Sequence, residues 1–586
     1  MPACPAHLSF VLAAFRRLAV SIVFTAISAS LHAATHRGAD LPWTTYEAEA
    51  MKTNGAVLGP KYEPHQLETE ASGQKCVKLT AVGEFVEFPA LAKANTLVIR
   101  FSVPDSKDGN GTAASLNLLI NGKLVKTLAL TSRYSWLYGN YPFTNRPEDG
   151  KPRNFFDEIR VKDLRIARDD VIRLEKSSAE DPPCVIDLAD LEEVAPPLTA
   201  PANALSVLEF GAGGKGETDD TKSLVNCIAE AKRQGKIVWV PAGDYKLTGD
   251  IILPSGVTIQ GAGMWHTTFV GDEKIYGQSA RRVRFKLNGS HIHLADFAIV
   301  GKLNYRNDDE PNDGVVGAVC SDSTVARIWI EHTKTGAWIY NGTRLRIEGC
   351  RFRDLLADGV NLCVGTNGTV IENCSTRGTG DDCFAIWPTA TDQSYIQDAR
   401  PGNNVIRHCT AQLPFLAQGI AIYGGFSNLV EDCLTKDITS SCGILISTTF
   451  PTSDESRKID NNFSGTTVIR NCEVLRCGGY DHEWGWRGSL QICLDRRSIS
   501  GLTISGLEIK DSISDGVMIV APGSKKGQGT LSNARLERVD ISNYGTGLPD
   551  QHGLFIAKDV LGSITVVDSK IPETQNNSAH FSINSE

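Results

Sequence analysis

Three aspartates with a regular spacing are the residues of this chain best suited to chemistry. Asp358 and Asp382 are 24 residues apart (382 − 358 = 24), and Asp381 adjoins the second of them. If the first two stack one strand spacing apart, roughly 4.8 Å, three carboxyl groups meet. They cannot all ionise cheaply, so at least one pKa should rise. A raised acid beside an ionised base is the pair that hydrolysis of a glycosidic bond requires.

The same interval recurs in the elements that must position these acids. Short β-type runs end in cysteine, and Cys350 to Cys374 and Cys409 to Cys433 are also 24 residues apart (374 − 350 = 24; 433 − 409 = 24). A repeat of this length predicts a solenoid of stacked coils. An apolar residue takes the cysteine position in other coils, so we interpret the cysteines as an inward ladder of small hydrophobes. Disulfides between stacked neighbours are the alternative. The column comprises Ile328, Cys350, Cys374, Cys409, Cys433, Cys472, Leu507 and Val539.

A second column contains glycine in most coils, and the residue before it varies. A solenoid needs no carboxylates there for packing, and stacking like charges costs stability. Acids in two successive coils therefore indicate function, while a solvated aspartate ladder or an aspartate turn is the structural alternative. The residues before the glycine column are Thr335, Asp358, Asp382, Gln418, Cys442, Asp515 and His552.

Insertions lengthen the coils at 387–402, 448–467 and 478–488, and insertions on a solenoid usually build one face. They carry aromatic side chains, which either stack on a neutral sugar chain or belong to the core. Beside clustered acids, the group of aromatics favours a sugar-binding face. The candidate substrate-binding residues are Trp387, Tyr423, Phe426, Trp484, Trp486 and, in the acid column, Gln418.

The N-terminus has the pattern of an export signal. Arg16-Arg17 precede an apolar run from Leu18 to Leu31, followed by small residues at Ala33-Ala34. The run is short for a bilayer span, so we expect residues 1–34 to be cleaved and the chain to be secreted or periplasmic, without a membrane anchor. The mature net charge would be 57 − 68 = −11, which argues against nucleic acid and, more weakly, against a polyanionic substrate.

Two domains are expected after the signal. Residues 41–195 consist of short alternating runs with an Asn121-Gly122 hairpin, which predicts a β-sandwich. Residues 196–203 are rich in proline and alanine and are interpreted as a linker. Residues 204–586 contain one helical segment with Leu224, Cys227, Ile228 and Ala231 on one face, followed by the coils. The fold class is thus all-β.

The sandwich resembles carbohydrate-binding modules of families 6 and 35, on its opening Tyr-Glu-Ala-Glu and its closing Asp-Leu-x-x-Leu-Glu pattern. The resemblance implies a structural calcium held by Glu47, Glu49 and Asp187, since hard oxygen ligands suit this ion. A solvated acidic edge strand is the alternative. Trp136, Tyr138 and Tyr141 would form a sugar-stacking face or belong to the core.

The second domain resembles right-handed parallel β-helices of the pectate-lyase superfamily. Gly380-Asp381-Asp382-Cys383 is similar to the polygalacturonase signature, but the Gly-His-Gly and Arg-Ile-Lys motifs of those enzymes are missing. Together with Ala-Asp-Gly-Val-Asn-Leu at 357–362, the pattern looks more like glycoside hydrolase family 87, although Gln418 stands where members often have histidine.

The family resemblance implies an inverting endo-hydrolase of α-1,3-glucan or nigeran with Asp358, Asp381 and Asp382 as catalytic carboxylates. Asp358 and Asp382 would hold the attacking water while Asp381 protonates the leaving oxygen. The carboxyl separation for inversion should be roughly 6.5–9.5 Å. No catalytic cofactor is expected, and we expect a monomer.

Two other classes compete with this prediction. A polygalacturonase- or dextranase-like hydrolase, or a polysaccharide lyase, would use the same scaffold; the lyase would need a basic residue and cations for a uronate, and Arg470, Arg487 and Arg496 leave it open. A non-catalytic glycan-binding protein would tolerate loss of all three aspartates.

Overall fold

The computed structural model describes residues 37–586, except 142–144, 146, 151, 274–282, 392–399, 483–484, 496 and 523–528. The predicted export signal lies outside the described residues, as do Trp484 and Arg496. Among the described residues, no helix has the length and apolar character needed to cross a bilayer.

The first domain is built of antiparallel sheets, as predicted. Strand β13 (Cys184–Glu192) is buried along its whole length, because one of its faces lies in the sandwich core and the other meets residues of the β-helix. The Asn121-Gly122 hairpin joins β7 to β8, and both turn residues have positive φ (51° and 74°), as such a turn requires. The strands of one sheet are β1 (Trp43–Glu47), β3 (Ala56–Leu58), β4 (Cys76–Leu79), β6 (Thr96–Ser102), β11 (Asp157–Val161) and β13. Those of the second are β2 (Lys52–Thr53), β5 (Phe85–Pro89), β7 (Ala113–Ile120), β8 (Lys123–Thr131) and β12 (Val171–Lys176), and a two-stranded ribbon comprises β9 (Trp136–Tyr138) and β10 (Pro152–Asn154).

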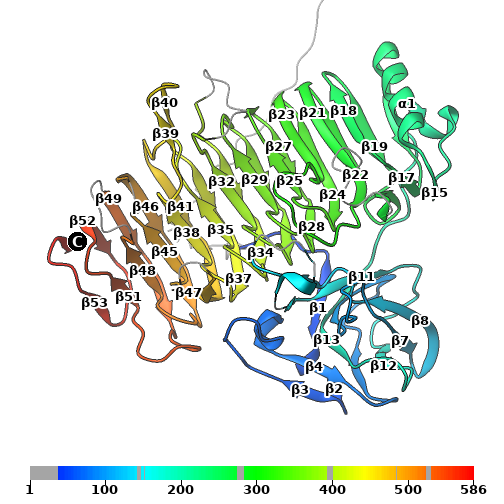
Figure 1. The fold of residues 1–586 in the computed structure, drawn as a ribbon, viewed down its shortest axis with the longest axis horizontal. Helices are drawn as coiled ribbons and strands as arrows, with labels where there is room; N and C mark the ends of the chain where they lie inside the picture. The colour runs from blue at the N-terminus through cyan, green and yellow to red at the C-terminus, as the bar shows by residue number, and fades with distance from the viewer. Residues whose placement is uncertain are drawn as a thin grey trace, which may run out of the picture. The chain divides into compact units, whose positions relative to one another are not determined.

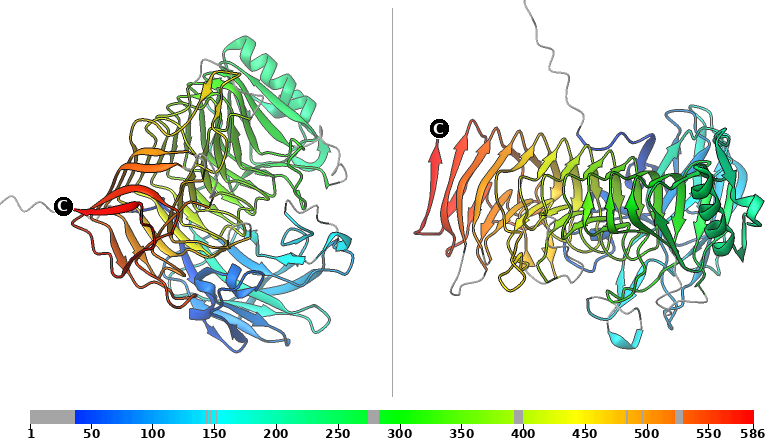
Figure 2. Two further views of the ribbon diagram at one scale, coloured as in Figure 1. Left: turned by 60° about the vertical axis from the view of Figure 1, so that its left-hand side comes forward. Right: turned by 90° about the horizontal axis from the view of Figure 1, so that it is seen from above.

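The second domain is a parallel β-helix, in which each strand pairs with the equivalent strand of the next coil (Figure 1; Figure 2, right). One face of the β-helix is a parallel sheet whose residues line the candidate site. Its strands are β18 (Asp250–Pro254), β21 (Arg284–Ser290), β23 (Val315–Ser321), β25 (Ala337–Ile339), β26 (Gly342–Thr343), β29 (Val360–Cys363), β32 (Phe384–Trp387), β35 (Ile420–Ile422), β38 (Ile444–Ser447), β45 (Leu490–Cys493), β48 (Val517–Val520), β51 (Leu554–Ile556) and β53 (Thr574–Asn576).

The remaining coil strands form one continuous parallel ladder. They are β14 (Ala204–Ser206), β15 (Lys215–Asp219), β16 (Ile237–Val240), β17 (Gly243–Lys246), β19 (Thr258–Gly261), β20 (Thr267–Val270), β22 (His293–Val300), β24 (Thr324–Glu331), β27 (Arg346–Glu348), β28 (Arg351–Arg353), β30 (Val370–Glu372), β31 (Ser375–Arg377), β33 (Val405–Arg407), β34 (Thr410–Gln412), β36 (Leu429–Glu431), β37 (Leu434–Ile438), β41 (Thr467–Arg470), β42 (Glu473–Cys477), β46 (Ile499–Ser505), β47 (Glu508–Lys510), β49 (Thr530–Glu537), β50 (Asp540–Ser542), β52 (Leu561–Val567) and β54 (Phe581–Ser585). Two short hairpins, β39 (Ser453–Asp454) with β40 (Ile459–Asp460) and β43 (Tyr480–Asp481) with β44 (Gly485–Trp486), lie in the insertions.

The helix α1 (Thr221–Gln234) closes the start of the β-helix. Leu224, Cys227, Ile228 and Ala231 are its buried face, as predicted. Asp219 accepts a hydrogen bond from the backbone N–H of Thr221 at 3.0 Å and so satisfies a free donor of the first turn.

The cysteine column is an inward ladder, as its replacement by isoleucine, leucine and valine predicted. The register pairs of neighbouring coils align its members, and each is buried. All fourteen cysteines from Cys76 to Cys493 are free thiols in the described part of the chain. Burial without a cross-link suits cysteine as a small hydrophobe.

The second column is also in register, with one coil that the sequence repeat did not reveal. Backbone N–H groups of Gly359 and Cys383 donate to the carbonyls of Asp382 and Gln418 in the next coil, at 3.0 and 2.9 Å. Further along, β45 forms an extra coil between β38 and β48, and Ser489 takes the position that glycine holds elsewhere. Serine and the preceding insertion conceal this repeat.

The sandwich and the β-helix are joined by buried contacts. Arg351 of β28 binds Glu192 of β13 through both nitrogens at 2.7 and 2.8 Å. Arg377 of β31 binds Asp190 at 2.7 Å and also Glu158. The segment predicted as a linker is tied down too, since the backbone N–H of Leu198 donates to the carbonyl of Ala262 at 2.9 Å.

Candidate active site

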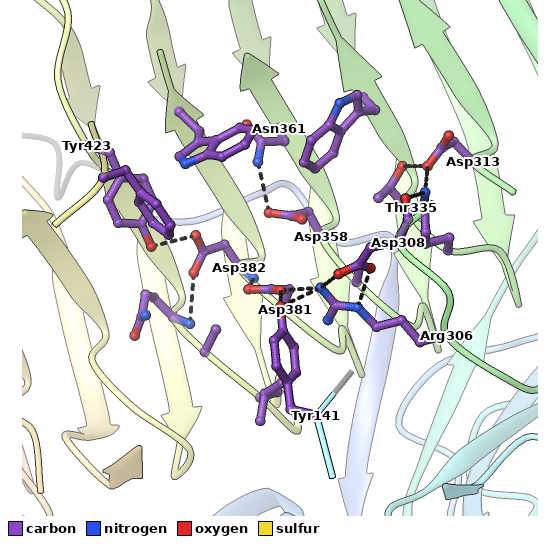
Figure 3. Close-up of a pocket in the computed structure, with 18 of the residues that line it drawn as sticks. Tyr141, Arg306, Asp308, Asp313, Thr335, Asp358, Asn361, Asp381, Asp382 and Tyr423 are labelled. Carbon is purple, nitrogen blue, oxygen red and sulfur yellow. Dashed lines mark hydrogen bonds and ion pairs between the residues drawn. The ribbon is translucent and has the colours of Figure 1, made fainter. Parts of the chain in front are cut away.

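A cavity of about 610 Å³ opens on the β18–β53 face, beside the second column. Besides the coils, its walls include Tyr141 of the sandwich, the segment 301–314 between β22 and β23, and residues of the insertions 448–467 and 478–488. Asp358, Asp381 and Asp382 all line it (Figure 3). The structure therefore brings the three predicted catalytic residues together.

The strand register explains their proximity. Asp358 precedes β29 and Asp382 precedes β32, and these strands are direct neighbours in the sheet. One carboxylate oxygen from each of the three aspartates lies within 4.8 Å of the others. This is closer than the roughly 6.5–9.5 Å expected for inversion, because adjacent coils and adjacent residues set the spacing.

Of the three carboxyl groups, Asp358 has the weakest hydrogen-bond donors around it. It is 5% exposed, and its Oδ1 accepts a hydrogen bond from the Asn361 side-chain amide at 3.2 Å. Burial raises the pKa of this carboxyl well above its ordinary value, and the charges of Asp381 and Asp382 raise it further. Asp358 therefore holds a proton more readily than an ordinary aspartate.

Asp382 is equally buried but receives stronger donors. It is 4% exposed; the Tyr423 hydroxyl donates to its Oδ2 at 2.9 Å and the backbone N–H of Gln418 donates to its Oδ1 at 3.1 Å. Burial and the neighbouring Asp381 raise the pKa of Asp382, while these two donors lower it. The donors favour the ionised form, as a base needs.

Asp381 is the most exposed of the three, at 23% of its side chain. Its Oδ1 accepts from the backbone N–H of Asp382 at 3.1 Å, and its Oδ2 accepts from Arg306 at 2.8 Å. Tyr141 reaches the same oxygen with its hydroxyl at 3.5 Å. Asp381 is thus the carboxyl with both a direct cationic partner and an open side towards the cavity.

Aromatic rings form a wall beside the acids. Trp387 and Tyr423 line the cavity as predicted, together with Trp338, Tyr340 and Phe450. Neighbouring rings lie at centroid distances of 5.8 Å for Trp338 and Trp387, and 5.6 Å for Trp387 and Phe450. Such a row offers flat apolar faces for sugar rings.

Other predicted substrate contacts are placed differently. Gln418 lines the cavity, but its backbone supports Asp382. Phe426 and Trp486 do not line the cavity: Phe426 packs under Arg400, with the guanidinium 4.5 Å from the ring centre, and Trp486 packs against Tyr480. Trp484 lies outside the described residues.

Several lining residues escaped sequence analysis. The position of Trp338 could have been predicted from the repeat, because Trp338 follows Gly336 by two residues just as Asn361 follows Gly359. Trp338 and Asn361 pair in register. Arg306 had none, since the segment 301–314 contains no repeat. Charged lining residues are mainly acidic, with eight carboxylates against four cationic groups: Asp308, Asp309, Glu310, Asp313, Asp358, Asp381, Asp382 and Asp481 against Arg284, Arg306, Lys334 and Arg487.

The predicted calcium ligands Glu47, Glu49 and Asp187 are not among the groups whose ligand atoms all lie within 4.8 Å of one another. Within the described residues, the groups close enough to share an ion are the three catalytic aspartates and Asp157, His332 and Asp354. Asp187 is instead paired with the guanidinium of Arg100, and Glu47 accepts from the hydroxyl of Ser72 at 3.0 Å. Oε2 of Glu47 and Oε2 of Glu49 are buried without a hydrogen-bond partner, so the calcium site that the resemblance implied stays a prediction.

Comparison with known families covers both domains. Residues 40–194 match the family model described as alpha-1,3-glucanase catalytic domain D1, and residues 217–559 match the model of catalytic domain D2. We expected a carbohydrate-binding module in residues 41–195. The first match instead describes residues 40–194 as part of a catalytic domain.

Solved structures of similar fold span nearly the whole chain. The Agl-KA catalytic domain is 25% identical with a TM-score of 0.80, covering 94% of this chain and 98% of that one. The catalytic unit of a glycoside hydrolase family 87 alpha-1,3-glucanase from Streptomyces thermodiastaticus strain HF3-3 is 28% identical with a TM-score of 0.78, covering 93% of each. A further catalytic domain of that family, described in complex with nigerose, is 24% identical with a TM-score of 0.77, covering 94% and 99%, and shares the fold.

Curated relatives match smaller parts. Alginate lyase 7 of Azotobacter vinelandii is 34% identical over 124 residues, which are 19% of this chain and 14% of that protein. The pre-neck appendage protein of Bacillus phage B103 is 24% identical over 246 residues, 41% of this chain and 26% of that protein. The chain thus spans about a quarter or less of the length of these two relatives.

Proposed function

The chain belongs to the family of alpha-1,3-glucanase catalytic domains, glycoside hydrolase family 87, and from this premise we propose that it cleaves α-1,3-glucosidic bonds in α-glucan by endo-acting, inverting hydrolysis. One observation carries the proposal: Asp358, Asp381 and Asp382 converge in a cavity with an aromatic wall. Membership of the family makes the chain a glycoside hydrolase.

We assign the attacking water to the stacked pair. A water that makes hydrogen bonds of about 2.8 Å to two carboxylate oxygens spans about 4.6 Å between them, which suits oxygens that lie within 4.8 Å of each other. Asp382, with its two donors, accepts the proton of this water, and Asp358 fixes its position. Water attack displaces the leaving sugar and inverts the anomeric carbon.

Asp381 is assigned as the acid that protonates the leaving oxygen, because it is the most exposed of the three and faces the cavity. We place the proton of the cluster on Asp358, because burial raises the pKa of this carboxyl, while Arg306 balances the charge of Asp381. The acid role then requires that proton to pass to Asp381 when substrate fills the cavity. Oxygens within 4.8 Å allow one water to relay it.

The charge of the lining supports a neutral polysaccharide. Eight carboxylates against four cationic groups repel a uronate chain, whereas polygalacturonate or pectate needs cationic partners. Arg487, which had left a lyase open, pairs with Asp481 at 3.4 Å, and Arg470 pairs with Glu431 on an outer strand. The aromatic wall suits glucose rings, and a solved relative is described in complex with nigerose, an α-1,3-linked disaccharide.

Retention is the alternative that the spacing of the carboxyl groups favours. Retaining glycosidases hold their two carboxyl groups about 5–5.5 Å apart, close to the spacing found here. In that case one buried aspartate would attack the anomeric carbon and form a covalent intermediate. The configuration of the first product distinguishes the two routes.

The activity is tested with a panel of polysaccharides. The mature chain from residue 35 onwards is incubated with α-1,3-glucan, nigeran, dextran and polygalacturonate, and released sugars are separated by size. We expect oligosaccharides from α-1,3-glucan or nigeran only; their sizes report endo action. Release from polygalacturonate alone, or from none, would contradict the proposal.

Asp381→Asn tests the acid. General acid catalysis contributes about 10²- to 10⁴-fold, so kcat should fall by that factor while the thermal midpoint stays unchanged. Turnover near the native value in this variant would exclude Asp381 as the acid.

Export remains part of the proposal. We infer that residues 1–34 direct the chain out of the cytoplasm, where a polymeric glucan would be met, and that it acts as a monomer. Mass spectrometry of the protein recovered from culture medium or periplasm, with size-exclusion chromatography, checks both; an uncleaved cytoplasmic protein would contradict export.

A further inference from the structure

One side chain of the sandwich lies at the catalytic aspartates. We propose that Tyr141 of the sandwich and Arg306 of the segment 301–314 form a clamp that positions Asp381 and balances its charge during the reaction. Neither residue is assigned a role by the family match or by the sequence repeat. The inference rests on the proposed function, because it concerns the residue proposed as the acid.

Arg306 is a buried hub that ties together the two coils carrying the acids. Its Nη1 donates to the carbonyls of Gly380 at 3.0 Å and Leu356 at 3.3 Å. Gly380 immediately precedes Asp381, and Leu356 lies two residues before Asp358. One guanidinium therefore fixes the backbone on which both acids depend.

The other nitrogens of Arg306 bind the acid itself and its surroundings. Nη2 donates to Asp381 Oδ2 at 2.8 Å and to the Tyr141 hydroxyl at 2.9 Å, while Nε donates to Asp308 at 2.8 Å (Figure 3). Its side chain is 5% exposed, so the ion pair with Asp381 is little screened by solvent. Arg306 has five N–H donors, and no lysine could reproduce this set of contacts.

Tyr141 connects this hub to the opposite wall of the cavity. Its ring stacks under the Arg306 guanidinium at 4.7 Å and lies 5.3 Å from the His482 ring in the insertion 478–488. Its hydroxyl points at Asp381 Oδ2 at 3.5 Å. Burial and the charge of Asp381 raise the pKa of Tyr141, so its hydroxyl stays a neutral donor.

The clamp is not needed to hold the sandwich on the β-helix, because other contacts already join the two domains. An apolar seam of Leu137 and Phe155 packs on Leu356 and Phe415, and the Phe155 and Phe415 rings stack at 4.1 Å. Buried ion pairs such as Arg351–Glu192 reinforce the same interface. Tyr141 is 37% exposed and is not part of this apolar seam, so its placement at Asp381 is better explained by the chemistry.

The experiment separates charge from geometry at Arg306. In Arg306→Gln the positive charge beside the acid is lost, so kcat should fall about 10- to 100-fold with little change in KM, and the alkaline limb of the pH–rate profile should move up by about one pH unit. Arg306→Lys keeps a charge without the fork, so the alkaline limb should stay near its native position while kcat is only partly restored.

Tyr141→Phe tests the sandwich half of the clamp with little risk to folding. The ring remains and the hydroxyl is lost, so kcat should fall about 3- to 10-fold at constant KM. Tyr138→Phe is the matched control: three residues away, its hydroxyl donates to Asp105 at 2.7 Å within the sandwich. It should leave kcat and the pH profile unchanged. Arg173→Gln, in the outer sheet and paired with Glu87, is the control for loss of an arginine.

Native kcat and an unmoved alkaline limb in Arg306→Gln would overturn the proposal, as would equal losses in Tyr138→Phe and Tyr141→Phe. If Arg306→Gln fails to fold, Tyr141→Phe decides alone. If the native chain hydrolyses no α-1,3-glucan, the proposed function fails, and the clamp is tested separately by comparing crystal structures of the native chain and Arg306→Gln. The Asp381 carboxylate should then leave the position it has beside Arg306 in the native chain, and an unchanged position would refute the clamp.

Discussion

Replacing Tyr423 with phenylalanine isolates one hydrogen bond in the catalytic cluster. The Tyr423 hydroxyl donates to Asp382 Oδ2 at 2.9 Å, and both residues are buried. The ring packs edge-on against Phe450 with centroids 4.9 Å apart, and phenylalanine preserves that contact. The substitution thus removes the donor and leaves the aromatic wall in place.

The magnitude follows from the charge on the acceptor. A hydrogen bond to a charged group contributes about 1.5–3 kcal/mol, and about 1.4 kcal/mol corresponds to one pKa unit. This donor holds the pKa of Asp382 down against burial and Asp381. Its loss should raise the pKa of Asp382 by about 1–2 units. The base must be ionised, so the acidic limb of kcat/KM moves to higher pH by the same amount.

The assay is the pH dependence of kcat/KM on a soluble α-1,3-gluco-oligosaccharide. The variant should lose about 10- to 100-fold at acidic pH and approach the native rate as pH rises. Tyr544→Phe is a matched control, because the Tyr544 hydroxyl donates to Glu573 at the same 2.9 Å in the C-terminal coils. An acidic limb that stays in place, or a loss equal at all pH values, would refute Asp382 as the base.

Three further predictions concern stability and thiols. Arg351→Met should lower the free energy of unfolding by about 3–5 kcal/mol in urea titration, because Glu192 stays buried without its cationic partner and keeps only the Trp265 indole as a donor. A loss below about 1 kcal/mol would show that the pair does not hold the domains together. Burial and the charge of Asp187 raise the pKa of Glu47 to about 7. The contribution of Glu47 to the free energy of unfolding is therefore present below about pH 4.5 and is lost as pH rises through 7. Glu47→Gln should flatten the pH dependence of the free energy of unfolding, and the same slope in the variant would contradict the role of Glu47. A thiol assay on denatured chain 37–586 should find all fourteen cysteines free, whereas a lower number would reveal disulfides.

The repeat in the sequence was sufficient to predict the β-helix and the position of its stacked aspartates. A 24-residue interval forces Asp358 beside Asp382, because strand neighbours in a parallel coil share one position. The cysteine column was predictable for the same reason, since isoleucine, leucine and valine replace cysteine at equivalent positions. Periodicity thus predicts whatever the coil geometry fixes.

The remaining features depend on contacts that no period encodes. Arg306 lies in a non-repeating segment, and Tyr141 reaches the acids from a separate domain, so only tertiary packing reveals them. Arg100 forms a buried ion pair with Asp187, and nothing in the acidic pattern of the edge strand discloses this guanidinium. The coil at Ser489 was missed because serine replaced glycine after an insertion.

The most direct test of the account is time-resolved proton NMR of the first product formed from an α-1,3-gluco-oligosaccharide. The anomeric signal is followed before mutarotation, with Asp381→Asn as the blank. Water held by Asp358 and Asp382 predicts that the β-anomer appears first and the α-anomer follows slowly. Initial release of the α-anomer would show a covalent intermediate and contradict the roles assigned to the three aspartates, and no product from the native chain would contradict the activity itself.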